Sequence, residues 1–386
     1  MTIAVLFWCA VGLACYAYFG YPCALMALAA VRKRPVTRQP VTPRVSVIIA
    51  AHNEEHRIRE KIANTLAQDY PPASLEIIVA SDCSSDATDT IVREFADRVR
   101  LVRSTERKGK EAAQQLAMEI AAGEVLVFSD VATGLAPSGV SSIVQNFADP
   151  SVGCVSSVDR FLDADGAPTG EGAYVRYEMC LRALESRVNS LVGLSGSLFA
   201  ARREVCRPWN ACLQSDFSTL LNAVEMGMRG VLDLETAGYY GSLADHRREP
   251  QRKTRTVVRG LSVLAAHRHM LNPFRYGLFA WQLASHKLCR WLVPFFMVVA
   301  AVTNAMLVSR SAVYRIAFAG QIAFYGMAAA GLAGVRRFRV TAFLVSANVA
   351  ILTAWLRYVR GDRITRWDPS ERLRRASATH SHQGST

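Results

Sequence analysis

The chain has 386 residues, of which 51% are hydrophobic, and its 45 Lys and Arg against 32 Asp and Glu give a net charge of +13. It is too long for one small domain and too apolar for a disordered tail. Its nine cysteines are scattered and form no CxxC pair. A disulfide scaffold, a zinc ribbon and a thioredoxin-type redox site are therefore not expected, and a reducing compartment is favoured.

The N-terminal segment, residues 1–31, predicts a transmembrane helix. Residues 2–31 carry no charge, and Arg32, Lys33 and Arg34 follow at once. Thirty helical residues are about 45 Å long, enough to cross a hydrocarbon core of about 30 Å. A cleaved signal peptide carries its positive charges before a shorter apolar core. A retained anchor is therefore expected, with a buried core helix as the alternative.

A C-terminal transmembrane region is predicted over residues 291–356. Its three uncharged runs are 291–309, 316–335 and 340–356. The positive-inside rule puts the N-terminus outside and the segment between the anchors in the cytoplasm. Four crossings would leave the basic tail, residues 357–386, outside against that rule. Either the rule fails there, or the last run is a re-entrant or interfacial segment.

Residues 276–290 mix aromatic and aliphatic residues with His286, Lys287 and Arg290. This mixture predicts an amphipathic helix at the cytoplasmic surface, or alternatively an ordinary surface helix of the soluble part. Membrane lipids with anionic headgroups then explain the positive charge. Nucleic acid is not expected as a partner, because the soluble part has no basic motif with interleaved aromatic residues.

Residues 43–265 predict an α/β domain, because short β-branched runs alternate with segments of helical apolar spacing. The runs are 45–49, 76–80, 100–103 and 125–128, and the helical segments are 55–66, 86–95 and 110–122. This order predicts a parallel sheet that is covered on both faces. Ligands are then expected at the carboxyl ends of the strands.

The loops at those ends carry acids and not the glycine patterns of common nucleotide sites. Residues 50–55 contain no glycine, which excludes a GxGxxG site. A Walker A motif around 108–110 is also excluded, because Ser104 stands where it requires glycine and Glu111 where it requires Ser or Thr. Asp82 and Asp130 each follow a predicted strand. Such a carboxylate can accept a base-edge N–H, bind a divalent cation, or only cap the next helix.

Five motifs follow one another along the chain. They are VSVIIAAHNEE at 45–55, Ser81-Asp82, ERKGK at 106–110, Phe128-Ser129-Asp130 and Ser215-Asp216-Phe217. In this order they resemble the family 2 glycosyltransferases, membrane-anchored nucleotide-sugar transferases related to cellulose and hyaluronan synthases. The resemblance covers nearly the whole chain. It implies an α/β fold with a Rossmann-like GT-A catalytic domain between N-terminal and C-terminal transmembrane helices.

By this resemblance, the base of a nucleoside diphosphate is bound after the first strand. Ala51, Asn53 and Glu54 are expected to hold uracil or another base. Asp82 is expected to accept a hydrogen bond from a ring N–H of that base. Lys110 is expected near the nucleotide.

Arg107 is expected near the nucleotide with Lys110, or both are solvated charges at the start of a helix.

The resemblance also implies a metal site. Asp130 resembles the first acid of a DxD metal motif, but Ala132 stands where the second acid often lies. Mg²⁺ or Mn²⁺ would then be held by Asp130, diphosphate oxygens and water.

The acceptor side of the resemblance centres on Asp216, which corresponds to the last acid of a TED-like motif and is expected to be the general base. Its alternative role is to cap a helix at 218–228. Gly196, in the segment 193–203, is expected to let the backbone approach a sugar; a tight turn before a strand is the alternative.

The basic run at 249–260 resembles the QxxRW segment of processive polymerases. Arg252 and Arg255 keep its spacing, and Arg255 is expected to neutralise the departing diphosphate. Thr256 replaces the tryptophan, which disfavours translocation of a growing polymer. A headgroup anchor is the alternative for this run.

The sequence therefore predicts an inverting glycosyltransferase of the bacterial inner (cytoplasmic) membrane, multi-pass, with its catalytic domain facing the cytoplasm. It is expected to move a sugar from a nucleotide-sugar, with UDP favoured, to a lipid-linked or polysaccharide acceptor in envelope or exopolysaccharide synthesis. Two alternatives stay open. One is a processive polysaccharide synthase, and the other is a non-catalytic membrane scaffold with a degenerate transferase domain.

Overall fold

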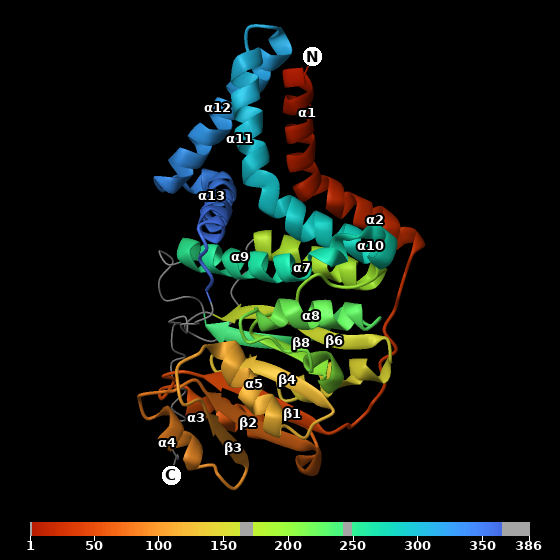
Figure 1. Cartoon of the computed structure of the whole chain (residues 1–386), viewed down its shortest axis with the longest axis vertical. Helices are drawn as coiled ribbons and strands as arrows, with labels where there is room; N and C mark the ends of the chain where they lie inside the picture. The colour runs from red at the N-terminus through yellow and green to blue at the C-terminus, as the bar shows by residue number, and fades with distance from the viewer. Residues whose placement is uncertain (1, 163–172, 242–248, 365–386) are drawn as a thin grey trace, which may run out of the picture. The chain divides into compact units, whose positions relative to one another are not determined.

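The computed structural model describes residues 2–162, 173–241 and 249–364 (Figure 1). The chain divides into two compact units. The sheet unit consists of the described residues within 35–183 and 193–246. The helical unit consists of those within 2–34, 184–192 and 247–364, so the last residues of α7 (Ala173–Val188) belong to it.

The sheet unit is built on one mixed eight-stranded sheet with the strand order β3-β2-β1-β4-β7-β6-β8-β5. The strands are β1 (Val45–Ala51), β2 (Leu75–Ser81), β3 (Val99–Arg103), β4 (Val125–Asp130), β5 (Gly134–Leu135), β6 (Val152–Leu162), β7 (Leu198–Arg202) and β8 (Arg229–Gly241). The neighbours from β3 to β4 are parallel, and β6 is parallel to β8. β7 is antiparallel to β4 and β6, and β5 is antiparallel to β8.

The four predicted strands are confirmed as β1 to β4, and they form the parallel part of the sheet. A parallel sheet is wrong for the remainder, because β7 enters beside β4 in the opposite direction. All seven residues of β1 are buried, as expected for a central strand that is covered on both faces. Hydrophobic periodicity marks such a strand but carries no information about its direction.

The helices of the sheet unit are α3 (Ile58–Leu66), α4 (Thr88–Arg93), α5 (Lys110–Ile120), α6 (Gly139–Gln145), α8 (Ser215–Glu225) and most of α7. α3 buries Ile58 and Ile62, spaced i and i+4, in the same core as Val47 and Val127 of the sheet. α3 and α4 each begin later than predicted. The residues before them form the connected loops of the site described below.

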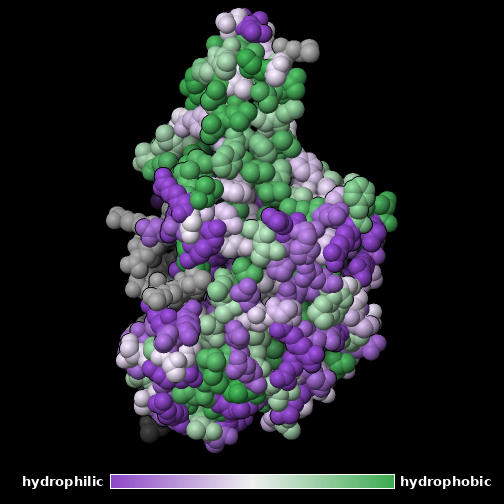
Figure 2. Space-filling model, viewed as in Figure 1, coloured by the Kyte–Doolittle hydropathy of each residue, from purple (hydrophilic) through white to green (hydrophobic). Residues whose placement is uncertain are grey.

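The helical unit contains α1 (Thr2–Cys15), η1 (Tyr16–Gly20), α2 (Tyr21–Val31), α9 (Glu249–Ala266), η6 (Arg268–Leu271), α10 (Pro273–Leu283), η7 (Ala284–Cys289), α11 (Arg290–Leu307), α12 (Ala312–Leu332), η8 (Arg336–Phe338) and α13 (Arg339–Val359). α1 packs against α11, and α13 packs against α9 (Figure 1). Figure 2 shows apolar side chains gathered on the surface of α1, α11 and α12. An exposed apolar surface of this extent is typical of contact with a membrane.

Three helical segments of the described chain are long and apolar enough to cross a membrane, namely Thr2–Val31, Pro273–Leu307 and Arg336–Val359. The predicted run 316–335 lies mostly in α12, which ends at Leu332. α12 is not among the three segments, because Arg315, Gln321 and several glycines lower its hydropathy. The run 340–356, for which a non-crossing placement was left open, lies in one of the three. Residues 276–290 continue directly from α10 into α11, and the chain kinks at Gly277, where φ is 50°.

A buried carboxylate joins three segments of the helical unit. Glu185, near the end of α7, is fully buried, and its Oε1 accepts a hydrogen bond of 2.6 Å from the Tyr21 hydroxyl of α2. His286 Nδ1 of η7 lies 2.7 Å from the same oxygen. The π-helical segments η1 and η7 are also joined, because the Tyr16 hydroxyl lies 2.8 Å from Ser285 Oγ. This polar network fixes the two bent helices to the end of α7.

Candidate active site

The loops that follow β1 and β2 are bound to each other. His52 Nδ1 lies 2.7 Å from the carbonyl oxygen of Asp82, and Asn53 Oδ1 accepts the Ser85 amide at 2.8 Å. The Glu54 amide donates to Thr88 Oγ1 at 2.8 Å. Ala51 and Glu54 are buried, whereas Asn53 is exposed and has a φ of 52°. The expected base-binding residues thus form one layer at the carboxyl ends of β1 and β2.

Asp82 fixes the segment that leads into α5. It is 2% exposed, and its two carboxylate oxygens accept the backbone amides of Lys108 and Gly109 at 2.9 Å each. Gly109 has a φ of 104°, a conformation that favours glycine. Asp82 therefore does not cap α4, the helix that follows it. A carboxylate oxygen has a second lone pair, so acceptance of a base N–H stays compatible with these bonds.

Lys110, the first residue of α5, bridges two parts of the sheet unit. Its Nζ donates to the Asp130 carboxylate and, at 2.8 Å, to the carbonyl oxygen of Gly196. Lys110 is buried, so the alternative of a solvated charge at the helix start is wrong for it. The neighbouring Arg107 is partly buried. The antiparallel pairing of β4 with β7 brings these groups together, and the Asp130 amide donates to Ser197 O at 2.9 Å.

Asp216 completes this group of side chains. A Cβ atom placed on Gly196 would lie 3.3 Å from Asp216 Oδ2, so glycine leaves room for the carboxylate. Asp216 is the second residue of α8 and is 8% exposed, while Gln214 is the N-cap residue. The alternative role of Asp216, as the N-cap of this helix, is therefore wrong. Lys110 therefore binds both Asp130 and the backbone of Gly196, and the Asp216 carboxylate lies next to the position where Gly196 has no side chain.

The environment of Asp216 suits a proton acceptor. Gln214 Nε2 donates to its Oδ2 at 3.1 Å. Asp216 lies in the first turn of α8, at the positive end of the helix dipole. An ionised carboxylate is the form that accepts a proton from a hydroxyl group.

Sequence reasoning missed the residues that hold the Gly196 segment. Ser195 Oγ and Ser197 Oγ both donate to Asp159 Oδ1, at 2.6 and 3.0 Å. The Ser195 amide donates to Ser156 Oγ at 2.7 Å, and Arg182 donates to the same hydroxyl. The signal for Asp159 was an acid placed within an apolar strand, β6. These bonds fix the backbone on both sides of Gly196.

Sequence reasoning also missed Lys61, which lies under the turn after β4. Lys61 is 3% exposed, and its Nζ donates to Ser129 Oγ at 2.7 Å and to Thr133 O at 2.6 Å. Burial lowers the pKa of Lys61 from its usual 10.5 to about 7, although the charge of Asp130 acts in the opposite direction. The signal was a lysine on the buried stripe of α3, beside Ile58 and Ile62.

The lowered pKa of Lys61 predicts how stability depends on pH. Between pH 7 and 10.5 this amine is mostly neutral in the folded chain and protonated in the unfolded chain. The unfolded state then binds more protons, so the contribution of Lys61 to stability rises with pH, by at most about 1.4 kcal/mol per pH unit. Denaturation of wild type and Lys61→Met between pH 7 and 9 measures this difference, and parallel pH profiles would contradict it.

Arg252 and Arg255 lie on α9 of the helical unit, both partly buried. α9 packs on α13 through its intervening residues, because Lys253 Nζ lies 3.8 Å from the ring centroid of Phe343 and Thr254 Oγ1 donates to Ala350 O at 3.3 Å. A contact of the two arginines with diphosphate stays a prediction.

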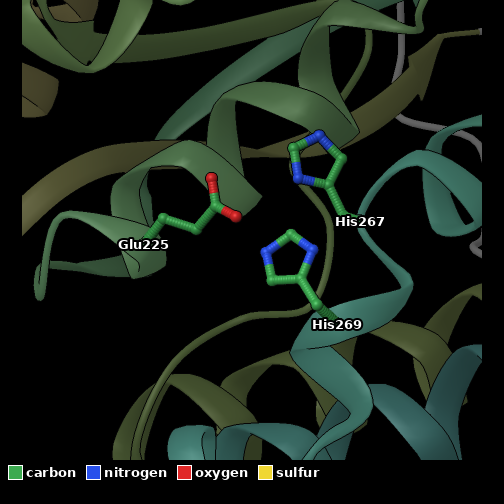
Figure 3. Close-up of side chains that lie close together, drawn as sticks. All are labelled: Glu225, His267 and His269. Atoms are coloured by element: carbon green, nitrogen blue, oxygen red, sulfur yellow. The ribbon is translucent and has the colours of Figure 1, made fainter.

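The turn after α9 carries two histidines (Figure 3). The ring centroids of His267 and His269 lie 6.1 Å apart. Glu225, also labelled in Figure 3, is the last residue of α8 and belongs to the sheet unit.

Asp130 fits a divalent cation that is held mainly by substrate. Within the described residues, Asp130 is not part of any group of three His, Cys, Asp or Glu side chains that could hold an ion. Mg²⁺ and similar cations are commonly bound by one or two carboxylates together with substrate phosphates and water. A single carboxylate at the end of β4, with Ala132 in place of a second acid, matches that mode of binding.

Comparison with known proteins identifies the class of this fold. Residues 46–209 match the sequence family "Glycosyl transferase family 2". The probable glycosyltransferase YdaM of Bacillus subtilis is 29% identical over 175 residues, which are 42% of this chain and 41% of that protein. UDP-Glc:alpha-D-GlcNAc-diphosphoundecaprenol beta-1,3-glucosyltransferase WfgD of Escherichia coli is 38% identical over 87 residues, 22% of this chain and 34% of that protein. The chain thus spans less than half the length of these curated relatives.

A solved structure matches over a longer part of the chain. It is the mannosyltransferase PcManGT from Pyrobaculum calidifontis in complex with GDP-Man and Mn²⁺, with a TM-score of 0.71 and 25% identity. The match covers 92% of this chain and 99% of that one. This likeness confirms the predicted GT-A fold.

Proposed function

We propose that the protein, whose residues 46–209 match the glycosyl transferase family 2, transfers a sugar from a nucleotide-sugar to a lipid-linked or glycan acceptor, with inversion at the anomeric carbon. The observation that carries this proposal is the grouping of Asp130, Lys110 and Asp216 around Gly196. Lys110 Nζ donates to the Asp130 carboxylate and to the Gly196 carbonyl oxygen, and the missing side chain of Gly196 leaves room for the Asp216 carboxylate. A carboxylate that can take a proton thus lies near an ammonium group and near a carboxylate that can hold a divalent cation for a diphosphate.

In the proposed reaction, Asp216 takes the proton of an acceptor hydroxyl as its oxygen attacks the anomeric carbon. The bond from this carbon to the diphosphate breaks on the opposite face, which inverts the configuration. Lys110 offsets negative charge on the departing diphosphate, because an ammonium is a compact cation with three donors. Asp130 would hold a Mg²⁺ or Mn²⁺ ion, whose positive charge would offset part of the same negative charge.

The donor proposed is a UDP-sugar, and the acceptor is a lipid-linked or polysaccharide glycan of the bacterial envelope. Support comes from WfgD, whose name specifies UDP-Glc and a diphosphoundecaprenol acceptor. PcManGT was solved with GDP-Man, which makes a GDP-sugar the donor to test beside it. Thr256 in place of an aromatic platform favours a single addition over processive synthesis.

The location proposed is the inner membrane, with the sheet unit in the cytoplasm. Three candidate spans support this, because an odd number of crossings puts the basic tail on the same side as the catalytic domain. The positive-inside rule also places a basic tail in the cytoplasm. Presentation of a lipid-linked acceptor at the membrane surface then follows from the anchors.

The test uses the purified full chain in lipid nanodiscs with Mn²⁺, radiolabelled UDP- and GDP-sugars, and an undecaprenyl-diphosphate-linked acceptor. The expected result is consumption of one donor and a product that is one sugar longer. A ladder of long products would overturn single addition in favour of a processive synthase. Absence of both turnover and nucleoside diphosphate binding would overturn the proposal and leave the non-catalytic scaffold.

A further inference from the structure

A polar stripe on α3 reaches the turn that carries Asp130. Lys61 and Asn64 lie on α3, and Gln68 follows two residues after the helix ends, so the three are spaced i, i+3 and i+7. This spacing places them on one face. We propose that this stripe, the α3 clamp, positions the Asp130 turn for the diphosphate, an inference that rests on the proposed transferase function.

Lys61 binds the turn at both ends. Its two acceptors belong to Ser129, the residue before Asp130, and to Thr133, three residues after it. The Thr133 amide in turn donates to the carbonyl oxygen of Asp130 at 3.1 Å. The buried amine of Lys61 thus fixes the residues on both sides of Asp130, and Lys110 binds the Asp130 carboxylate.

Asn64 and Gln68 extend the clamp along the chain. Asn64 exchanges two hydrogen bonds with Leu135, because its Nδ2 donates to Leu135 O and its Oδ1 accepts the Leu135 amide, both at 2.9 Å. Gln68 Oε1 accepts the Val140 amide at the start of α6, at 3.0 Å. Three side chains therefore hold the whole segment from the end of β4 to α6.

Packing alone does not account for a buried lysine at this position. Removing an amine from water costs free energy, whereas an apolar side chain of similar length, such as Met, would not carry that cost. The clamp explains this choice, because the amine can bind both ends of one turn. It also matters more here than in a site with two acids, since Ala132 leaves Asp130 as the one carboxylate of the motif.

The test is titration of UDP and GDP into the purified full chain at several Mn²⁺ concentrations, well below the melting temperature. Mn²⁺ is expected to increase nucleotide affinity up to a plateau. Lys61→Met is expected to raise the Mn²⁺ concentration that gives half of this increase by about tenfold or more, as for other residues that orient a metal ligand. Asn64→Ala is expected to have a smaller effect and Gln68→Ala the smallest, because their contacts lie progressively farther along the chain from Asp130. Arg59→Met, an exposed change on the same helix, is the control and should match wild type.

The outcomes separate this inference from the proposed function. A wild type that binds neither nucleotide with Mn²⁺ overturns both. The clamp alone is overturned if wild type binds nucleotide and Lys61→Met has a lower melting temperature but the same Mn²⁺ requirement. Lys61 would then stabilise the fold without positioning Asp130. If Lys61→Met does not fold, Asn64→Ala decides the question, and an unchanged Mn²⁺ requirement in that variant contradicts the clamp.

Discussion

Asp216→Asn is expected to lower kcat for sugar transfer by about 10²- to 10⁴-fold and to leave donor affinity nearly unchanged. Asparagine keeps the shape of the side chain but cannot take a proton from the acceptor hydroxyl. Its amide still fits beside Gly196, and α8 loses no cap, because Gln214 holds that position. The loss should therefore appear in the rate of the chemical step and not in the fold.

Single-turnover transfer and calorimetric binding of the nucleoside diphosphate measure these two effects separately. Asp97→Asn is the matched control, because Asp97 is an exposed acid in the turn before β3. Equal turnover in wild type and Asp216→Asn would remove Asp216 from the mechanism. If Asp97→Asn lost as much turnover as Asp216→Asn, the loss would not be specific to the position of Asp216 in the site.

Asp130→Ala is expected to abolish the dependence of nucleotide binding on Mn²⁺ and to reduce transfer by about 10²- to 10³-fold. The change removes the one acid of the shortened motif and also the partner of Lys110. Asp130→Asn is the informative companion, because its amide oxygen can still accept from Lys110 but binds a cation weakly. Both variants should therefore lose the Mn²⁺ response, and only Asp130→Ala should also disturb Lys110.

Titration of nucleoside diphosphate with and without Mn²⁺ decides this prediction. Wild type is expected to bind more tightly when Mn²⁺ is present, and the two variants should bind with the same affinity in both conditions. A full Mn²⁺ response in Asp130→Ala would mean that other groups hold the ion, and the proposed metal ligand would be wrong.

Much of the catalytic half of the fold could be predicted from the sequence, because local patterns record it. The strands β1 to β4 are short buried runs, and Asp82 and Asp130 each lie at a strand end, where a parallel sheet brings loops together. Asp216 was proposed through the motif that contains it, and its role as a base stays a prediction. The exact partner of each acid was not predictable: Asp82 binds the amides of Lys108 and Gly109, which a strand-end position does not reveal.

The missed features depend on contacts between distant segments. β7 lies antiparallel to β4 and brings Gly196 to Lys110, but the run Leu198–Arg202 carries no mark of direction or neighbour. Lys61 was visible as a lysine on an apolar stripe, yet the acceptors of its amine are about 70 residues away. The run 316–335 was predicted to span because it carries no charge. The helix that contains most of it begins earlier and includes Arg315 and several glycines, and it is not among the candidate spans.

The carboxylate of Glu185 has a consequence for biosynthesis. Its two partners are 164 residues earlier and 101 residues later in the chain, at Tyr21 and His286. Before His286 is synthesised, Glu185 has only the Tyr21 hydroxyl of this pair, and a buried acid with one partner is costly. We therefore expect α2 and the end of α7 to pack stably only after His286 has left the ribosome. Nascent chains that stop before this point should stay open to membrane quality-control proteases, whereas chains a few turns longer should escape them.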